Sequence, residues 1–169
     1  MEYRNSLDKS GECSKNGKIA ENAFLALVKR KNCKFRKATI QEQFDHIDYI
    51  LNTNNTDIAF DVKAMKKVSR SSNKVSNDLV WVEFQNVSGK NGWLYGKSQC
   101  IAFEREKDFV IVSRKSLLEF CEKNVEKKKV YNSHEAIYKI YTREGRKDII
   151  SMIRMDDLLK QLEPIFWKK

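Results

Sequence analysis

The chain has little of what several protein classes require. It contains one proline, two histidines without a partner at ligand spacing, and four scattered cysteines without a CxxC pair. We therefore expect reduced thiols, with neither a structural zinc site nor a disulfide framework. No stretch approaches the roughly 18 apolar residues of a membrane span. The first residues also lack the apolar core of a secretory signal. These absences predict an intracellular, cytoplasmic protein with no membrane partner.

The remaining composition is that of a folded domain. In 169 residues, 41% are hydrophobic and 11% aromatic, which is enough for one hydrophobic core. Residues 1–14 are polar and we expect them to be a loose N-terminal segment. Residues 15–169 are expected to form a single domain.

The charge is strongly positive. Lys and Arg number 33 against 23 Asp and Glu, a net charge of +10. Such a field favours polyanions, with nucleic acid as the first candidate partner. Charge alone does not distinguish DNA from RNA. Basic residues crowd positions 29–37 and the Ser- and Asn-rich loop after residue 63. The predicted nucleic-acid-binding residues are Lys29, Arg30, Lys31, Lys34, Arg36, Lys37, Lys66, Lys67, Arg70, Lys90 and Lys97.

Residues 44–67 carry the chemistry. Two short apolar strands flank the polar turn 52–56, whose Asn and Thr side chains favour a reversal of the chain. Alternation in the second strand places Asp61 and Lys63 on one face, and Asp48 comes from the first strand. Converging carboxylates can hold a divalent cation, and a neighbouring lysine can position water or stabilise charge on a phosphate. Asp45 competes with Asp48 for this role, and Asp48 is the one that the apolar run Tyr49-Ile50-Leu51 follows directly.

The rest of the chain predicts helices and strands in alternation. A helix is expected over 15–31, with Glu21 at the edge of its apolar face. Strands are expected over 79–87, 100–103 and 109–112, then a helix capped by Ser113, a hairpin from 136–142 to 148–155, and a short helix from residue 156. We expect a charged connector at 124–135 and a docking tail at 165–167. The pattern predicts an α/β fold, with a central mixed sheet of about five strands flanked by helices.

Asp48, followed after a hairpin by Asp61-Val62-Lys63, resembles the D…(D/E)xK signature of the PD-(D/E)XK nuclease superfamily. The resemblance covers roughly residues 15–125, including the helix with Glu21 and the strand Trp81-Val82-Glu83-Phe84-Gln85. One departure is Ile47, which stands where the signature has proline. In size and charge the chain is most similar to small phage-type endonucleases and Holliday-junction resolvases.

This resemblance implies a restriction-endonuclease-like fold and a metal-dependent endonuclease that hydrolyses phosphodiester bonds, with branched DNA as substrate and a homodimer as the active form. It implies Mg²⁺, with Mn²⁺ able to substitute, bound by Asp48, Asp61, the Val62 carbonyl and Glu21. The implied catalytic residues are Glu21, Asp48, Asp61, Lys63 and Gln85, with Glu83 as an alternative to Gln85. Two other functions stay open: a sequence-specific restriction-type endonuclease and a non-catalytic basic nucleic-acid-binding module.

Overall fold

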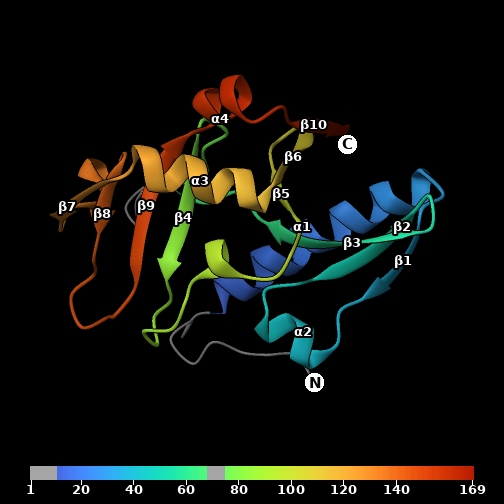
Figure 1. Ribbon diagram of the computed structural model, residues 1–169, viewed down its shortest axis with the longest axis horizontal. Helices are drawn as coiled ribbons and strands as arrows, with labels where there is room; N and C mark the ends of the chain where they lie inside the picture. Colours follow the sequence, from blue (N-terminus) through green and yellow to red (C-terminus); the bar gives the residue numbers. More distant parts are fainter. Residues whose placement is uncertain (1–10, 68–74) are drawn as a thin grey trace. The chain divides into compact units, whose positions relative to one another are not determined.

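The computed structural model describes residues 11–67 and 75–169, which form four α-helices and two β-sheets (Figure 1). The α/β class predicted from the sequence is confirmed. The chain divides into two compact units. The first contains the described residues up to Met65, Lys97–Val112 and Ile165–Lys169, and the second contains Lys66–Gly96 and Ser113–Pro164.

The first unit is built on a six-stranded mixed sheet, one strand more than the sequence predicted. Strands β2 and β3 pair antiparallel, whereas β3 and β5 pair parallel. The strands, in their order across the sheet, are β1 (Lys34–Lys37), β2 (Tyr49–Thr53), β3 (Thr56–Lys63), β5 (Cys100–Glu104), β6 (Asp108–Ser113) and β10 (Ile165–Lys168).

Two helices belong to the first unit. Helix α1 spans Glu12–Arg30 and confirms the helix predicted over 15–31. Its apolar face buries Ala20, Phe24, Leu27 and Val28. Helix α2 (Ile40–Phe44) is a short element that the sequence did not reveal. It begins with a capping box, in which Thr39 and Glu42 each accept a hydrogen bond from the other's backbone N–H.

The second unit holds a four-stranded sheet, in the order β4 (Leu79–Gln85), β9 (Ile149–Arg154), β8 (Lys139–Tyr141) and β7 (Glu126–Val130). Its helical elements are α3 (Arg114–Asn124), α4 (Met155–Gln161) and the short 3₁₀ turns η1 (Trp93–Tyr95) and η2 (Ser133–Glu135). The predicted hairpin, the strand over 79–87 and the Ser113 cap of α3 are all confirmed. The strand over 79–87, however, belongs to this second sheet.

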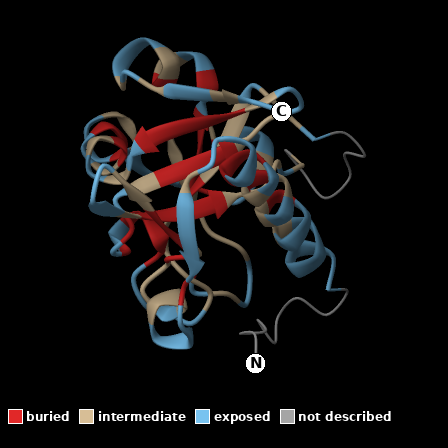
Figure 2. Cartoon of the chain, turned by 90° about the vertical axis from the view of Figure 1, so that its right-hand side faces the viewer, coloured by how far each residue is buried: buried red, intermediate tan, exposed pale blue. Residues whose placement is uncertain are grey.

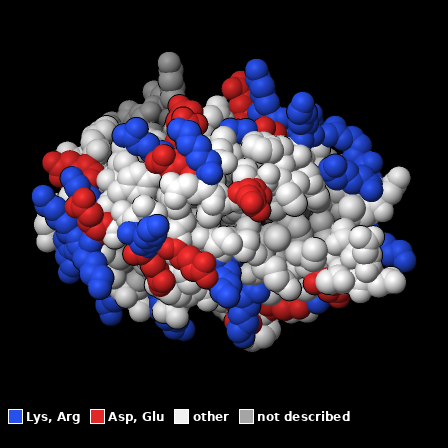
Figure 3. Space-filling view, turned by 45° about the horizontal axis from the view of Figure 1, so that its top comes forward, with Lys and Arg blue, Asp and Glu red and all other residues white. Residues whose placement is uncertain are grey.

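Burial and charge follow the elements. Figure 2 shows buried residues along the strands, while the outward sides of the helices are exposed. In the space-filling view of Figure 3, Lys and Arg side chains stand out in several clusters, with Asp and Glu among them. Among helices in the described residues, none is long and apolar enough to cross a membrane.

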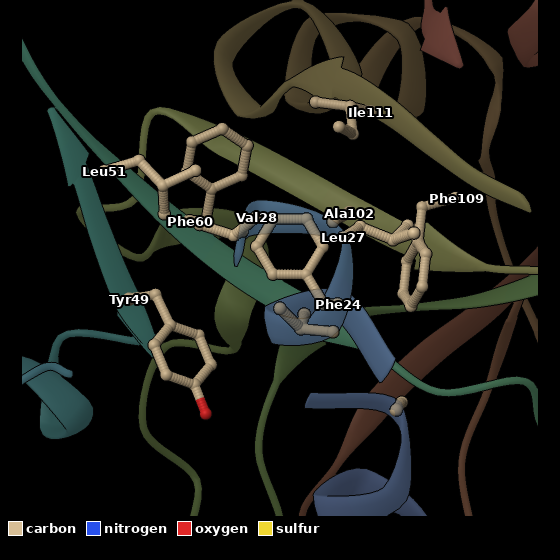
Figure 4. Close-up of a cluster of buried hydrophobic side chains, with 11 residues drawn as sticks. Phe24, Leu27, Val28, Tyr49, Leu51, Phe60, Ala102, Phe109 and Ile111 are labelled. Carbon is tan, nitrogen blue, oxygen red and sulfur yellow. The ribbon is translucent and has the colours of Figure 1, made fainter. Parts of the chain in front are cut away.

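The core of the first unit lies between α1 and one face of the six-stranded sheet (Figure 4). Phe24 of α1 is fully buried, and its ring centroid lies 5.5 Å from those of Phe60 and Phe109. Trp167 of β10 stacks on Phe24 at 5.4 Å, with the two rings 10° from parallel. The predicted docking tail at 165–167 is therefore, at Trp167, part of this core.

Three strands lie where no strand was expected: β1, β7, and β10, which forms in the predicted docking tail. Residues 124–135 were predicted to be a charged connector. That prediction is wrong at Glu126–Val130, which form strand β7. Strand β1 likewise falls inside the basic run 29–37. Strands β1 and β7 pair through their backbones while their side chains are mostly exposed, and neither carries the apolar alternation by which a strand is identified in a sequence.

Candidate functional site

The hairpin of β2 and β3 places two aspartates opposite each other. Asn54 and Asn55 form its two-residue loop with φ angles of 50° and 61°, the conformation of a type I′ turn. The ladder ends with the pairs Ile50↔Ala59 and Tyr49↔Phe60, so Asp48 and Asp61 lie next to its last pair, one on each chain segment. The Asp48 N–H donates to the Phe60 carbonyl at 2.8 Å. The side-chain pairing expected from the sequence is therefore present.

These aspartates lie on the face of the sheet that α1 does not cover. Tyr49, Phe60 and Val62 all belong to the cluster packed against α1. Because side chains alternate along a strand, Asp61 projects from the opposite face. Asp48 precedes β2, and the Asp61 charge raises its pKa, so the two carboxyls lie close together. The Val62 N–H donates to Asp48 Oδ2 at 2.7 Å, which fixes the Asp48 side chain beside β3.

Lys63 completes the group. Its Nζ lies 2.7 Å from Asp61 Oδ1, and the side chains of Lys63 and Asp61 are 22% and 4% exposed. Residues two apart on a strand share a face, so this pair follows directly from the acid-x-Lys spacing. The structure thus brings together Asp48, Asp61 and Lys63, the three residues that the sequence motif singled out.

The two carboxyls interact strongly. Burial, and then the charge of Asp61, raise the pKa of Asp48 from 3.8 to about 7, while Lys63 and the Val62 N–H oppose the rise. Two buried carboxylates this close repel each other when both are charged. With a pKa of about 7, Asp48 holds a proton over much of the range below neutral pH.

The geometry distinguishes Asp48 from Asp45. Asp45 lies at the end of α2, and its Oδ2 is 3.0 Å from Lys97 Nζ. The helix ends in a Schellman arrangement, with the Ile47 N–H bonded to the Glu42 carbonyl and His46 at φ 59°. This reversal feeds the chain into β2, so that Asp48 rather than Asp45 faces Asp61.

Glu21 does not join the aspartate pair. It belongs to α1, which packs on the opposite face of the sheet, and its Oε2 accepts a hydrogen bond from the Tyr49 hydroxyl at 3.2 Å. Within residues 11–67 and 75–169, no group of three or more His, Cys, Asp or Glu side chains is arranged to hold a metal ion. The structure therefore gives no support to Glu21 as a metal ligand alongside Asp48 and Asp61.

Gln85 and Glu83 belong to β4 in the second unit. The Gln85 amide donates to the Lys147 carbonyl within that unit. A glutamine that does contact β3 is Gln99, which was not predicted. Its side-chain oxygen accepts from the Ala59 N–H at 2.7 Å, and its own N–H donates to the Ala59 carbonyl at 2.9 Å. Gln99 thereby extends the β3–β5 pairing beside the aspartate pair, a role that depends on a long-range strand pairing and left no signal in the sequence.

A small hard cation fits what the pair offers. The N–H and C=O of one strand residue point to the same neighbouring strand, so the Val62 carbonyl faces β2 as its N–H does. Two carboxylates and one carbonyl are then available. Mg²⁺ is commonly bound through one or two carboxylates and keeps several waters. The donor set suits Mg²⁺ or Mn²⁺ and lacks the nitrogen and sulfur ligands that zinc prefers.

The predicted nucleic-acid-binding residues are divided between the units. In the first unit Lys29, Arg30 and Lys31 end α1 or follow it, Lys34, Arg36 and Lys37 lie on the exposed strand β1, and Lys97 precedes β5. Lys66, Lys67 and Lys90 belong to the second unit, and Arg70 lies outside the described residues. Several of these side chains have partners within the protein. Arg30 donates to the Lys168 carbonyl at 2.7 Å, Arg36 forms two 2.8 Å hydrogen bonds with Glu42, Lys97 pairs with Asp45, and Lys31 Nζ lies 5.2 Å from the Trp167 ring centroid.

Comparison of the chain with protein-family models, with curated proteins and with solved structures found no match.

Proposed function

We propose that the protein is a metal-dependent endonuclease that hydrolyses phosphodiester bonds in DNA. The observation that carries the proposal is the group of Asp48, Asp61 and Lys63. Two opposed carboxylates with an ammonium 2.7 Å from one of them form a compact arrangement for a cation and a phosphate. The raised pKa of Asp48 supports it, because perturbed carboxyl groups concentrate at functional sites.

Each residue has a role in this chemistry. Asp48 and Asp61, with the Val62 carbonyl, would hold Mg²⁺ or Mn²⁺. The bound ion supplies positive charge that offsets the charge on the phosphate and on the attacking oxygen. Asp61 holds the Lys63 ammonium at the same face of the sheet. Lys63 orients the attacking water and stabilises the negative charge that grows on the phosphate in the transition state.

Two finer parts of the proposal rest on the family resemblance. They are a preference for branched DNA, such as a four-way junction, and action as a homodimer that makes two symmetric cuts. The basic residues of α1 and β1 would contact phosphates, which positions the DNA without reading its sequence.

The test is a cleavage assay on end-labelled four-way junction, duplex and single strand, with Mg²⁺ or EDTA. Asp61→Asn is compared with Asp57→Asn, a matched control on the same strand whose side chain accepts a hydrogen bond from Asn52. We expect Asp61→Asn to lower the cleavage rate at least about 100-fold, whereas Asp57→Asn retains it. Cleavage that persists in EDTA or in Asp61→Asn would refute the metal-dependent mechanism.

A second function follows from a specific observation. The described residues offer no third acidic ligand beside the pair. A non-catalytic nucleic-acid-binding module needs no metal ligands, so this observation agrees with such a module. In that case DNA binding is equal in wild type and Asp61→Asn, no substrate is cut, and Mg²⁺ does not raise the melting temperature. Reproducible cutting at one sequence in random duplex would instead favour a restriction-type endonuclease.

A further inference from the structure

Strand β7 carries a basic surface that the proposed active site does not use. Its residues Glu126, Lys127, Lys128 and Lys129 are all exposed, and only Val130 is buried. The strand is at the edge of the four-stranded sheet. Lys and Arg side chains gather at the left end of Figure 3, the end where β7 and β8 lie in Figure 1.

The fold does not require these lysines. β7 pairs with β8 through its backbone, and Val130 is the member of the strand that enters the apolar cluster with Ala136 and Met152. In the described parts of the chain, no acidic side chain forms an ion pair with Lys127, Lys128 or Lys129. Lysine is also depleted in strands generally. Three consecutive like charges repel one another, and a bound polyanion would relieve that repulsion.

Tyr131 adds an aromatic ring to the same surface. It follows the strand directly and is 77% exposed, against 59% or less for the other exposed large hydrophobic residues. Because Val130 points inward, its neighbours Lys129 and Tyr131 both project outward, about 7 Å apart along an extended chain. A cation and an exposed ring at this spacing match one phosphate and an unstacked base of a nucleic-acid strand.

We propose that Lys127, Lys128, Lys129 and Tyr131, the β7 surface, bind a single-stranded segment of nucleic acid. The lysines contact phosphates and Tyr131 stacks on an unpaired base. This inference deepens the proposed nuclease function, on which it rests for its biological setting. It gives the second unit a part in holding DNA with unpaired bases, the form that occurs at branches.

The experiment measures binding of a fluorescently labelled 20-nucleotide oligo-dT by anisotropy, in EDTA and over a range of salt concentrations. A variant with Lys127→Gln, Lys128→Gln and Lys129→Gln is compared with a control that carries Lys107→Gln, Lys115→Gln and Lys160→Gln. The control removes the same charge from three other exposed lysines. Because each phosphate contact on a single strand adds about 0.7 to the slope of log K against log salt, we expect the β7 variant to lower the slope by about 2. The control should change it by much less.

Tyr131→Ala tests the stacking. We expect it to weaken oligo-dT binding roughly 5- to 150-fold, as loss of one base–aromatic stack does, while Tyr131→Phe binds as wild type and duplex binding stays unchanged. All these side chains are exposed, so each variant should melt at the wild-type temperature. The proposal is overturned if the β7 variant behaves like the control, or if Tyr131→Ala affects duplex and single strand equally. The binding assay is run in EDTA and the cleavage assay needs Mg²⁺, so loss of oligo-dT binding in the β7 variant and loss of cleavage are scored separately, and failure of one proposal is distinguishable from failure of the other.

Discussion

At the scale of single residues, the buried aspartate pair lowers the stability of the folded protein at neutral pH. Asp48 has its pKa raised to about 7 by burial and by Asp61. Between pH 4 and 7 the folded protein keeps a proton that the unfolded chain has released. Folding stability therefore falls as pH rises through this window, and the full cost is present above pH 7. Such a cost is what a trade between activity and stability would produce at the proposed metal site.

Asp48→Asn should remove that cost in the metal-free protein. At pH 8 we expect the variant to be more stable than wild type by about 2 kcal/mol, and at pH 4 the difference should shrink toward zero. Urea unfolding in EDTA at the two pH values measures both free energies of unfolding. Asp57→Asn is the control and should not show this pH dependence. Equal offsets at pH 4 and pH 8 would contradict the assignment of the raised pKa to Asp48.

The positions of site residues could be predicted from the sequence where a short-range pattern, such as strand alternation or a turn, determines them. Asp61 and Lys63 share a face because they are two residues apart on a strand, and Asp48 meets them because the Asn-rich turn sets the hairpin register. Gln99 reaches Ala59 only through the parallel pairing of β5 with β3, and no local pattern encodes such a pairing. Glu21 and Gln85 were assigned to the site by the resemblance alone. Glu21 accepts a hydrogen bond from the Tyr49 hydroxyl on the α1 face of the sheet, and Gln85 belongs to the second unit, where it donates to the Lys147 carbonyl.

At the scale of elements, one glycine of the second unit, Gly92, allows two backbone segments to pack closely together. Gly92 precedes η1 and donates its N–H to the Phe84 carbonyl at 2.9 Å. A Cβ at this position would overlap the Glu83 backbone, with the carbonyl carbon only 2.7 Å away. Backbone cannot move aside as the end of a side chain can, so only glycine fits.

Gly92→Ala should therefore destabilise the protein by at least about 2 kcal/mol. Gly17→Ala is the matched control, because Gly17 lies inside α1 and an added Cβ there meets nothing within 4 Å. That change should stabilise the protein by about 0.5–1 kcal/mol, since alanine favours the helix. Thermal melts of the two variants should shift in opposite directions. A shared direction would refute the steric argument at Gly92.

Helices and strands could be predicted from the sequence where their apolar residues recur at a clear helical or strand spacing. Helix α1 and strand β3 carry clear periods and lie close to where they were expected. Strands β1 and β7 are made almost entirely of charged residues, and their backbone pairing leaves no trace in the side-chain pattern. Helix α2 has five residues, too few to establish a helical period.

At the scale of the whole molecule, the connectivity interleaves the two units. The chain enters the second unit after Met65, returns at Lys97, leaves again after Val112 and ends in the first unit from Ile165. The sequence predicted most of the strands but not their division between two sheets, because that division is decided by contacts between residues far apart in the chain. One consequence is that the last strand, β10, packs its Trp167 against Phe24 of the first helix, α1, in the core of the first unit.

Trp167→Ala tests how much this packing of β10 against α1 stabilises the protein. The Trp167 ring stacks on Phe24, lies 6.2 Å from Phe60, and has Lys31 Nζ 5.2 Å from its centroid. Because the ring is only partly buried, we expect its loss to lower the free energy of unfolding by about 2–3 kcal/mol, below the range for a fully buried tryptophan. Phe166→Ala is the control, since Phe166 is 46% exposed, and it should cost less than about 1 kcal/mol. Urea unfolding followed by circular dichroism measures both variants. Equal losses would mean that β10 stabilises the first unit through its backbone pairing with β6 alone, whereas the predicted difference would show that the end of the chain holds α1 against the sheet that carries Asp48 and Asp61.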